Sequence, residues 1–217
     1  MLISCIMPTR GRQFYALLAL NCFYEQDYMD RELIVLDDAD DLSFPEGIHD
    51  SHVRYIVAHK RMNIPAKRNE LCKMAAGYVI AHWDSDDWYH PGRLSHQVKL
   101  LQESGKSVVG YRSALFHGPT MDRVSRYVRQ SDYAVGSSLM FTRDWWKKCP
   151  FRVDRFNRED KLMVESAFDA GELHSVDGEQ FMVARIHAGN TANKDPFNLP
   201  YRRVALSDLP EGYPIGV

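Results

Sequence analysis

The chain has 217 residues, 45% hydrophobic and 12% aromatic, which is enough apolar material for one substantial core but not for two. Its 27 Lys and Arg side chains against 29 Asp and Glu give a formal net charge of -2, which excludes the overall basic excess typical of non-specific nucleic-acid binding. No apolar run approaches the roughly 18 residues of a membrane span, and no signal peptide is recognisable. The four cysteines form no CxxC pair, which favours reduced thiols. We therefore expect one soluble, cytoplasmic domain over residues 1–217.

Short apolar runs alternate with segments of helical periodicity in the first half of the chain, a pattern that predicts an α/β fold. We predict strands over residues 2–7, 32–36, 53–57 and 78–83. We predict helices over residues 12–26 and 91–101, and a third helix that starts at Pro65 and stops at Gly77. After residue 105 we predict extended segments over 107–116, 123–129, 138–142 and, as the last strand, 180–187, with helices over 143–148 and 159–170. The proline-containing tail is predicted to be irregular.

Three carboxylates, of Asp84, Asp86 and Asp87, follow the predicted strand that ends at residue 83. In extended geometry Asp84 and Asp86 project to the same side of the chain. Magnesium and manganese are held by one or two carboxylates together with substrate phosphate oxygens, so this spacing fits a metal bridged to a diphosphate. Alternatively, Asp86 or Asp87 caps the helix that follows. The spacing alone leaves both interpretations open.

A second acidic run, Asp37 and Asp38, lies at the end of another predicted strand, where ligands of open α/β sheets bind. A carboxylate there can accept hydrogen bonds from a nucleobase or ribose, although an acidic turn continuing to Asp41 is the alternative. Neither GxxxxGK[ST] nor GxGxxG is present, which argues against a P-loop NTPase and a typical dinucleotide oxidoreductase. The loop at residues 8–12, PTRGR, offers a hydroxyl and guanidinium groups near a helix start instead.

Lys67, Arg68 and Asn69 are predicted in the first turn of a helix, where the helix dipole disfavours cations. This mismatch indicates an anionic partner.

Glu159 and Asp160 begin another predicted helix. They either compensate the helix dipole or cap the helix, or one of them is a general base. A loop with His187, Asn190 and Thr191 follows the predicted last strand; its histidine is either structural or a ligand of a manganese-type ion.

Taken together, these segments resemble the inverting family 2 glycosyltransferases with the GT-A fold. The resemblance rests on ISCIMPTRGR, ELIVLDD, AKRNELCKMAAGYVIAHWDSDDWYHPGRL, RED and IHAGNT, which occur in family order across residues 3–191. It implies a single GT-A domain with a mixed central sheet. Residues 1–105 would bind the nucleotide sugar, and residues 106–217 would form the acceptor side and the tail. Trp83 departs from the small or aliphatic residue of the family, and we expect this to alter packing rather than chemistry.

The resemblance also implies roles for individual residues. The donor site would comprise Pro8, Thr9, Arg10, Asp38, Arg68, Asp84 and Ser85, with Asp38 contacting the base and Arg68 facing the nucleotide or its phosphates. Asp86, with Asp84, would ligate Mn²⁺ or Mg²⁺, and His187 would complete the metal shell. Asp160 would be the catalytic base that deprotonates an acceptor hydroxyl. The implied donor is a nucleoside-diphosphate sugar, with a UDP-sugar favoured.

The acceptor is less defined by the sequence. Three arginines alternate on one face of a predicted strand: Arg123, Arg126 and Arg129. The stretch beside Asp160 is also basic and contains two tryptophans: Arg143, Lys147, Lys148, Arg152, Arg155, Arg158 and Lys161, with Trp145 and Trp146. Such a stretch binds nucleic acid or a phosphorylated lipid carrier, or it is a solvated surface with two core tryptophans. The acceptor candidates are therefore a saccharide, a lipid-linked glycan and DNA carrying hydroxylated bases. A non-catalytic nucleotide-sugar binding protein and a nucleotidyltransferase are the alternative functions.

Overall fold

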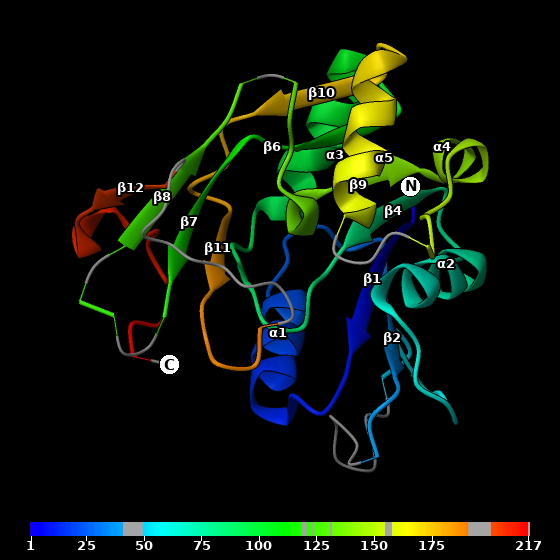
Figure 1. Ribbon diagram of the computed structural model, residues 1–217, viewed down its shortest axis with the longest axis horizontal. Coiled ribbons are helices and arrows are strands. Elements are labelled where there is room, and N and C mark those ends of the chain that lie inside the picture. Colours follow the sequence, from blue (N-terminus) through cyan, green and yellow to red (C-terminus); the bar gives the residue numbers. More distant parts are fainter. Residues whose placement is uncertain are drawn as a thin grey trace.

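The computed structural model describes residues 1–40, 50–118, 121–122, 124–130, 132–154, 158–190 and 201–216. Asp41, Arg123, Arg155 and Thr191, which the sequence analysis singled out, lie outside these residues, as does most of the loop before the tail. The described chain forms two β-sheets with helices packed against the larger one (Figure 1). Among the described residues, no helix combines the length and apolar character needed to cross a membrane.

The larger sheet has seven strands in the order β10-β6-β9-β4-β1-β2-β3. Their bounds are β1 Ile3–Thr9, β2 Arg31–Asp37, β3 Val53–Val57, β4 Val79–His82, β6 Val108–Tyr111, β9 Met140–Thr142 and β10 Leu173–Val176. Strand β1 pairs in parallel with β2 and β4, whereas β9 runs antiparallel between β4 and β6. The sheet is therefore mixed, which confirms the predicted fold class.

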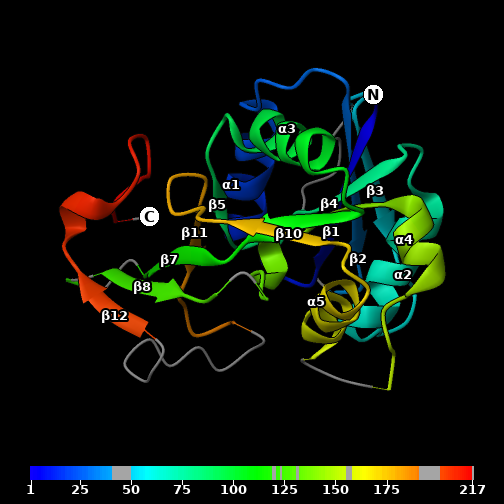
Figure 2. The same ribbon diagram turned by 90° about the horizontal axis from the view of Figure 1, so that it is seen from above.

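In the described part of the chain, five α-helices accompany the sheet: α1 Gln13–Tyr24, α2 Ile64–Met74, α3 Arg93–Ser104, α4 Arg143–Lys148 and α5 Glu159–Asp169. One apolar core joins α1 and α3 to one face, and a second core joins α2, α4 and α5 to the other face (Figure 2). Side chains of β1 alternate between the two cores, since Cys5 and Met7 enter the first and Ile6 enters the second. Because both faces are covered, the central strands are continuous apolar runs in the sequence.

The smaller sheet extends to the left of the larger one in Figure 1 and has the strand order β12-β8-β7-β11-β5. Its strands are β5 Trp88–Tyr89, β7 Ser113–His117, β8 Val124–Val128, β11 Met182–Arg185 and β12 Tyr201–Val204. Short 3₁₀ helices, η1 Gly136–Ser138 and η2 Leu206–Asp208, complete the described elements. The prediction of an irregular tail is wrong at β12, which pairs antiparallel with β8. Strands β5 and β10 were not predicted either.

Helix α2 shows how local sequence positions the site. The side chain of Asn63 caps the helix by accepting a hydrogen bond from Ala66 N at 2.8 Å, and Pro65 lies in the first turn, where its missing N–H costs nothing. The helix ends at Met74, before the predicted stop at Gly77. Helix α2 begins at Ile64, so Arg68 lies in the second turn. The prediction that Arg68 lies in the first turn is therefore wrong.

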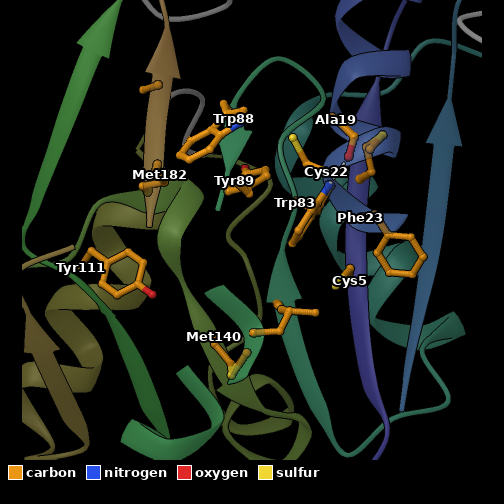
Figure 3. Packing of buried hydrophobic residues seen from close by; sticks show 14 of the residues in the cluster. Cys5, Ala19, Cys22, Phe23, Trp83, Trp88, Tyr89, Tyr111, Met140 and Met182 are labelled. Atoms are coloured by element: carbon orange, nitrogen blue, oxygen red, sulfur yellow. Dashed lines mark hydrogen bonds between the residues drawn. The ribbon is translucent and has the colours of Figure 1, made fainter. Parts of the chain in front are cut away.

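Trp83 fills the space between β4 and α1, next to Tyr89 (Figure 3). Its indole is fully buried and donates a hydrogen bond to the backbone carbonyl of Ala19 at 2.9 Å. The guanidinium of Arg93 lies 5.2 Å from the centre of the Trp83 ring. Trp83 therefore packs in the first core, immediately before the acidic motif in the chain.

Candidate active site

Two cavities lie at the edge of the larger sheet where β1 and β4 end. One has a volume of about 310 Å³ and the other of about 520 Å³, and they meet at Pro8, Arg12 and Ile64, which line both. Ligands of open α/β sheets bind at this edge, because the loops that follow parallel strands converge there.

Most of the predicted site residues line these cavities. The smaller cavity includes Pro8, Arg68, Asp84, Ser85, Asp86 and Asp160, and the larger one includes Pro8, Thr9 and Arg10. Asp38 and His187 line neither cavity, but each contacts a residue that does. The structure thus brings together residues that are up to 152 positions apart in the sequence, from Pro8 to Asp160.

The acidic motif forms a compact cluster. One carboxylate oxygen of each of Asp84, Asp86 and Asp87 lies within 4.8 Å of the others, and Asp86 and Asp87 are buried. The alternative that Asp86 or Asp87 caps the next helix is wrong, because α3 begins after Gly92 and has no side-chain cap. Asp87 instead accepts a hydrogen bond from Arg185 N at 3.2 Å, which ties the motif to β11.

Asp86 receives three donors on one oxygen, Oδ2. They are the guanidinium of Arg12 at 2.6 Å, the side-chain amide of Asn190 at 3.1 Å and Nε2 of His187 at 3.2 Å. Gly189 N donates to Nδ1 of His187, so the ring proton of a neutral His187 is on Nε2, facing Asp86. The ring of Tyr15 stacks on His187 with centroids 4.1 Å apart. The N-terminal loop and the loop after β11 therefore converge on this carboxylate.

Arg68 connects the acidic motif to the start of α5. Its buried guanidinium donates to Asp84 at 3.1 Å, to Glu159 at 3.3 Å and to Asp160. The anionic partners inferred for the cations of α2 are, for Arg68, carboxylates of the protein itself. Asn69 is structural, because its amide oxygen accepts from the backbone N of Phe151 and from the indole of Trp146.

Asp160 lies in the first turn of α5 against η1, where acidic side chains interact favourably with the helix dipole. A Cβ atom added to Gly136 would lie 2.7 Å from Cγ and 2.8 Å from Cβ of Asp160, so the close approach requires glycine. Beneath this contact, Nδ1 of His82 donates to the carbonyl of Gly136 at 2.7 Å. Burial lowers the pKa of His82 well below its usual 6.5, which keeps this ring neutral near pH 7.

Asp38 lies beside the larger cavity and forms a buried ion pair with Lys67, which lines that cavity. The ammonium group of Lys67 also donates to the Thr9 carbonyl at 2.7 Å, and Met62 N donates to Asp38 at 2.7 Å. Burial lowers the pKa of Lys67, although the adjacent Asp38 opposes this shift. The pair thus fixes the ends of β1 and β2 to α2, a role that the sequence did not indicate.

The basic stretch before Asp160 is mostly structural. Trp145 is buried in the second core, and Arg143 donates to the carbonyls of Ala75 and Gly77. Lys147 and Arg152 pair with nearby acids of their own segment. The alternative of packing tryptophans with surface charges is therefore the better description, while Arg158 and Lys161 line the smaller cavity.

Sequence reasoning missed several residues of this site. Arg12 belongs to the PTRGR loop, but no feature of the sequence predicts its contact with Asp86. Gly136 lies in a Gly-Ser-Ser segment without a distinctive pattern, and Tyr133 and Phe116 add aromatic lining to the smaller cavity.

Comparison with solved structures defines the class of fold. The chain superposes on Staphylococcus aureus TarS residues 1–349 in complex with UDP-GlcNAc with a TM-score of 0.69 and 18% identity, covering 88% of this chain and 60% of that one. It also superposes on the mannosyltransferase PcManGT from Pyrobaculum calidifontis, in complex with GDP-Man and Mn²⁺, with a TM-score of 0.62 and 15% identity, covering 85% and 56%. The chain has the GT-A fold of glycosyltransferases.

Sequence comparison gives the family. The profile described as Glycosyl transferase family 2 matches residues 4–181, and the chain belongs to this family. It is 33% identical over 206 residues to the putative colanic acid biosynthesis glycosyl transferase WcaA of Escherichia coli, covering 87% of this chain and 74% of WcaA. It is 30% identical over 214 residues to an uncharacterized glycosyltransferase of Rickettsia conorii, covering 89% of this chain but spanning only 34% of that protein.

Proposed function

We propose that the protein is a metal-dependent, inverting glycosyltransferase that moves a sugar from a nucleoside-diphosphate sugar to an acceptor hydroxyl. The observation that carries the proposal is that Asp84, Asp86 and Asp160 line one cavity. In this cavity the guanidinium of Arg68 donates hydrogen bonds to both Asp84 and Asp160. In this proposal the chain acts as one domain, with residues 1–105 binding the donor and residues 106–217 contributing the base and the acceptor side.

The donor set of the acidic motif fits a hard divalent cation. Carboxylate oxygens within 4.8 Å of one another are the ligands that Mg²⁺ and Mn²⁺ prefer, and the Mn²⁺ complex of PcManGT supports this assignment. Asp86 and Asp84 would hold the cation, with His187 beside Asp86. When bound, the cation supplies charge neutralisation for the departing diphosphate.

The donor would bind across both cavities. Pro8, Thr9 and Arg10 line the larger cavity and would contact the nucleoside, with Asp38 contacting the base beside Lys67. Arg68, Asp84 and Ser85 line the smaller cavity and would contact the sugar or phosphates. A UDP-sugar is favoured, and the UDP-GlcNAc complex of TarS supports this choice.

Asp160 would act as the general base. It would remove the proton of an acceptor hydroxyl as that oxygen attacks the anomeric carbon, and one displacement inverts this centre. Arg68 and the contact with Gly136 orient the carboxylate. The acceptor is a saccharide or a lipid-linked glycan; the relationship to WcaA, named for colanic acid biosynthesis, supports this class, and the comparisons give no support to a DNA acceptor.

Two variants test the proposal. Asp160→Asn should lower turnover by about 10²–10⁴-fold while leaving donor affinity nearly unchanged, because only the proton acceptor is lost. Asp86→Ala should abolish the metal-dependent binding of UDP-sugars, measured by titration calorimetry and by the rise in melting temperature with Mn²⁺.

Product analysis by NMR separates the candidate functions. A glycoside of inverted anomeric configuration with release of nucleoside diphosphate supports the proposal. Donor binding without transfer would identify a binding protein, and release of pyrophosphate would identify a nucleotidyltransferase. Full turnover in Asp160→Asn would remove Asp160 from its assigned role.

A further inference from the structure

Arg12 links three parts of the site. It follows β1 at the start of α1, and its guanidinium donates to Asp86 Oδ2 at 2.6 Å and to the carbonyl of Gly189 at 2.5 Å. Arg12 therefore joins the N-terminal loop to the acidic motif and to the loop after β11. Its side chain is 21% exposed and that of Asp86 is 9% exposed, so the ion pair is only weakly screened by solvent.

The Asp86 oxygen held by Arg12 belongs to a carboxylate that would ligate the cation. A guanidinium and a divalent cation cannot both lie against this oxygen without strong repulsion, because like charges a few ångströms apart interact strongly where solvent is scarce. His187 and Asn190 also donate to the same oxygen, so Oδ2 is already surrounded by donors while Arg12 stays in place. Metal binding through Oδ2 of Asp86 thus requires Arg12 to leave.

The position of Arg12 indicates its alternative partner. Among the described residues, three line both cavities, and Arg12 is the charged one, since the other two are Pro8 and Ile64. The boundary between the cavities is where the diphosphate would lie in a donor that spans them. The planar guanidinium matches phosphate oxygens in a bidentate manner, better than the point charge of lysine does.

We propose that Arg12 is an exchangeable donor-binding residue: it pairs with Asp86 until the divalent cation displaces it, and it then binds the diphosphate of the donor. This inference rests on the proposed function, because it needs a cation at Asp86. It assigns Arg12 two opposite effects. Arg12 weakens binding of the cation alone, by competition, and it strengthens binding of the nucleotide once the cation is present.

The test measures both effects in Arg12→Gln, which removes the charge but keeps a polar side chain. The backbone carbonyl of Arg12 accepts from Ala16 N at 2.8 Å independently of the side chain, so α1 should still begin normally. Mn²⁺ binding without nucleotide, measured from the EPR signal of free Mn²⁺, should become about tenfold tighter, and UDP binding at saturating Mn²⁺, measured by calorimetry, about tenfold weaker.

Three further variants serve as controls. Arg158→Gln removes a positive charge from the lining of the same cavity and should change Mn²⁺ affinity by less than about threefold, since solvent screens its exposed side chain. Arg12→Lys retains a competing charge and should bind Mn²⁺ nearly as the wild type does. Asp86→Asn tests the metal site itself, because it should lose Mn²⁺ binding whatever Arg12 does.

The outcomes distinguish this inference from the proposed function. If Asp86→Asn loses Mn²⁺ binding but Arg12→Gln binds Mn²⁺ no more tightly than the wild type, the exchange is refuted and the metal site stands. A loss of both affinities in Arg12→Gln would assign Arg12 a merely structural role, and unchanged UDP affinity would refute diphosphate binding. If Asp86→Asn binds Mn²⁺ as the wild type does, both proposals fail.

Discussion

The contact between Gly136 and Asp160 allows the catalytic role proposed for Asp160 to be tested without changing the proposed base itself. In Gly136→Ala, the added Cβ would lie 2.7 Å from Cγ and 2.8 Å from Cβ of Asp160, whereas ordinary contacts begin at 3.4 Å. A new rotamer of Asp160 cannot relieve the contact with Cβ, because the backbone fixes that atom. The start of α5, the 3₁₀ helix η1 or both must therefore move.

The structure sets the size of this effect. The shortfall from an ordinary contact is 0.7 Å at Cγ, so the carboxylate shifts by roughly that distance and its bond with Arg68 is disturbed. A displacement of about 1 Å in a reacting group costs about 10²-fold, and we expect kcat to fall by about 10- to 100-fold. Donor affinity should fall less than kcat, because the added Cβ meets Asp160 directly, whereas the proposed donor-binding residues of the same cavity are affected only through Arg68.

Steady-state kinetics with calorimetry of UDP and Mn²⁺ binding provides the measurement, and the thermal unfolding of the variant checks that it is folded. Gly92→Ala is a matched control, since its added Cβ meets His90 at 3.3 Å, remote from the base, and should leave kcat unchanged. In an Asp160→Asn background, Gly136→Ala should cost little more, because the base through which it acts is already lost. Wild-type kcat in Gly136→Ala would refute the placement of Asp160.

Two predictions concern stability. Burial lowers the pKa of His82 in the native state, so below about pH 6.5 the unfolded chain binds a proton that the folded chain does not. His82 therefore lowers the free energy of unfolding by up to about 1.4 kcal/mol for each pH unit below that value. In His82→Asn, the free energy of unfolding measured with urea should fall less steeply with decreasing pH, and an unchanged slope would contradict this role. Lys67→Met leaves the buried Asp38 carboxylate without its counter-ion and should lower the free energy of unfolding by about 3–5 kcal/mol. Lys73→Met, on the exposed side of the same helix, should lower it by less than about 1 kcal/mol. Equal losses in the two variants would show that the buried ion pair contributes no more to stability than the exposed one.

The sequence predicts those parts of the fold whose residues are covered on both sides. Strands β1, β2 and β4 are buried along most of their length, so they form apolar runs that end at polar residues. Strands β10 and β12 escape prediction because their sequences, LHSV and YRRV, have only two apolar residues each and show no alternation, whereas the edge strand β3 has the longer apolar run VRYIV. Strand β5 has two residues and exists through its pairing with β11, almost 100 positions away.

The residues of the candidate site likewise fall into those that the sequence predicts and those that it does not. Local spacing indicates the acidic motif at Asp84 and Asp86 and the acidic helix start at Asp160, because these features depend on neighbours in the sequence. The partners of these carboxylates depend on the tertiary fold, since Arg12 is 74 residues from Asp86 and Arg68 is 92 residues from Asp160. No local pattern distinguishes the arginines that make such pairs from arginines on the surface.

Helix α2 shows why an interpretation with a wrong premise still led to the site. The sequence predicts that its cations face a ligand because cations are unfavourable in a first turn, but Arg68 lies in the second turn. Adjacent residues on a helix point about 100° apart. Lys67 therefore reaches Asp38 at the end of β2, while Arg68 reaches Asp84 and Asp160. One turn of α2 thus compensates the carboxylates beside both cavities, so the helix fixes the larger cavity relative to the smaller one.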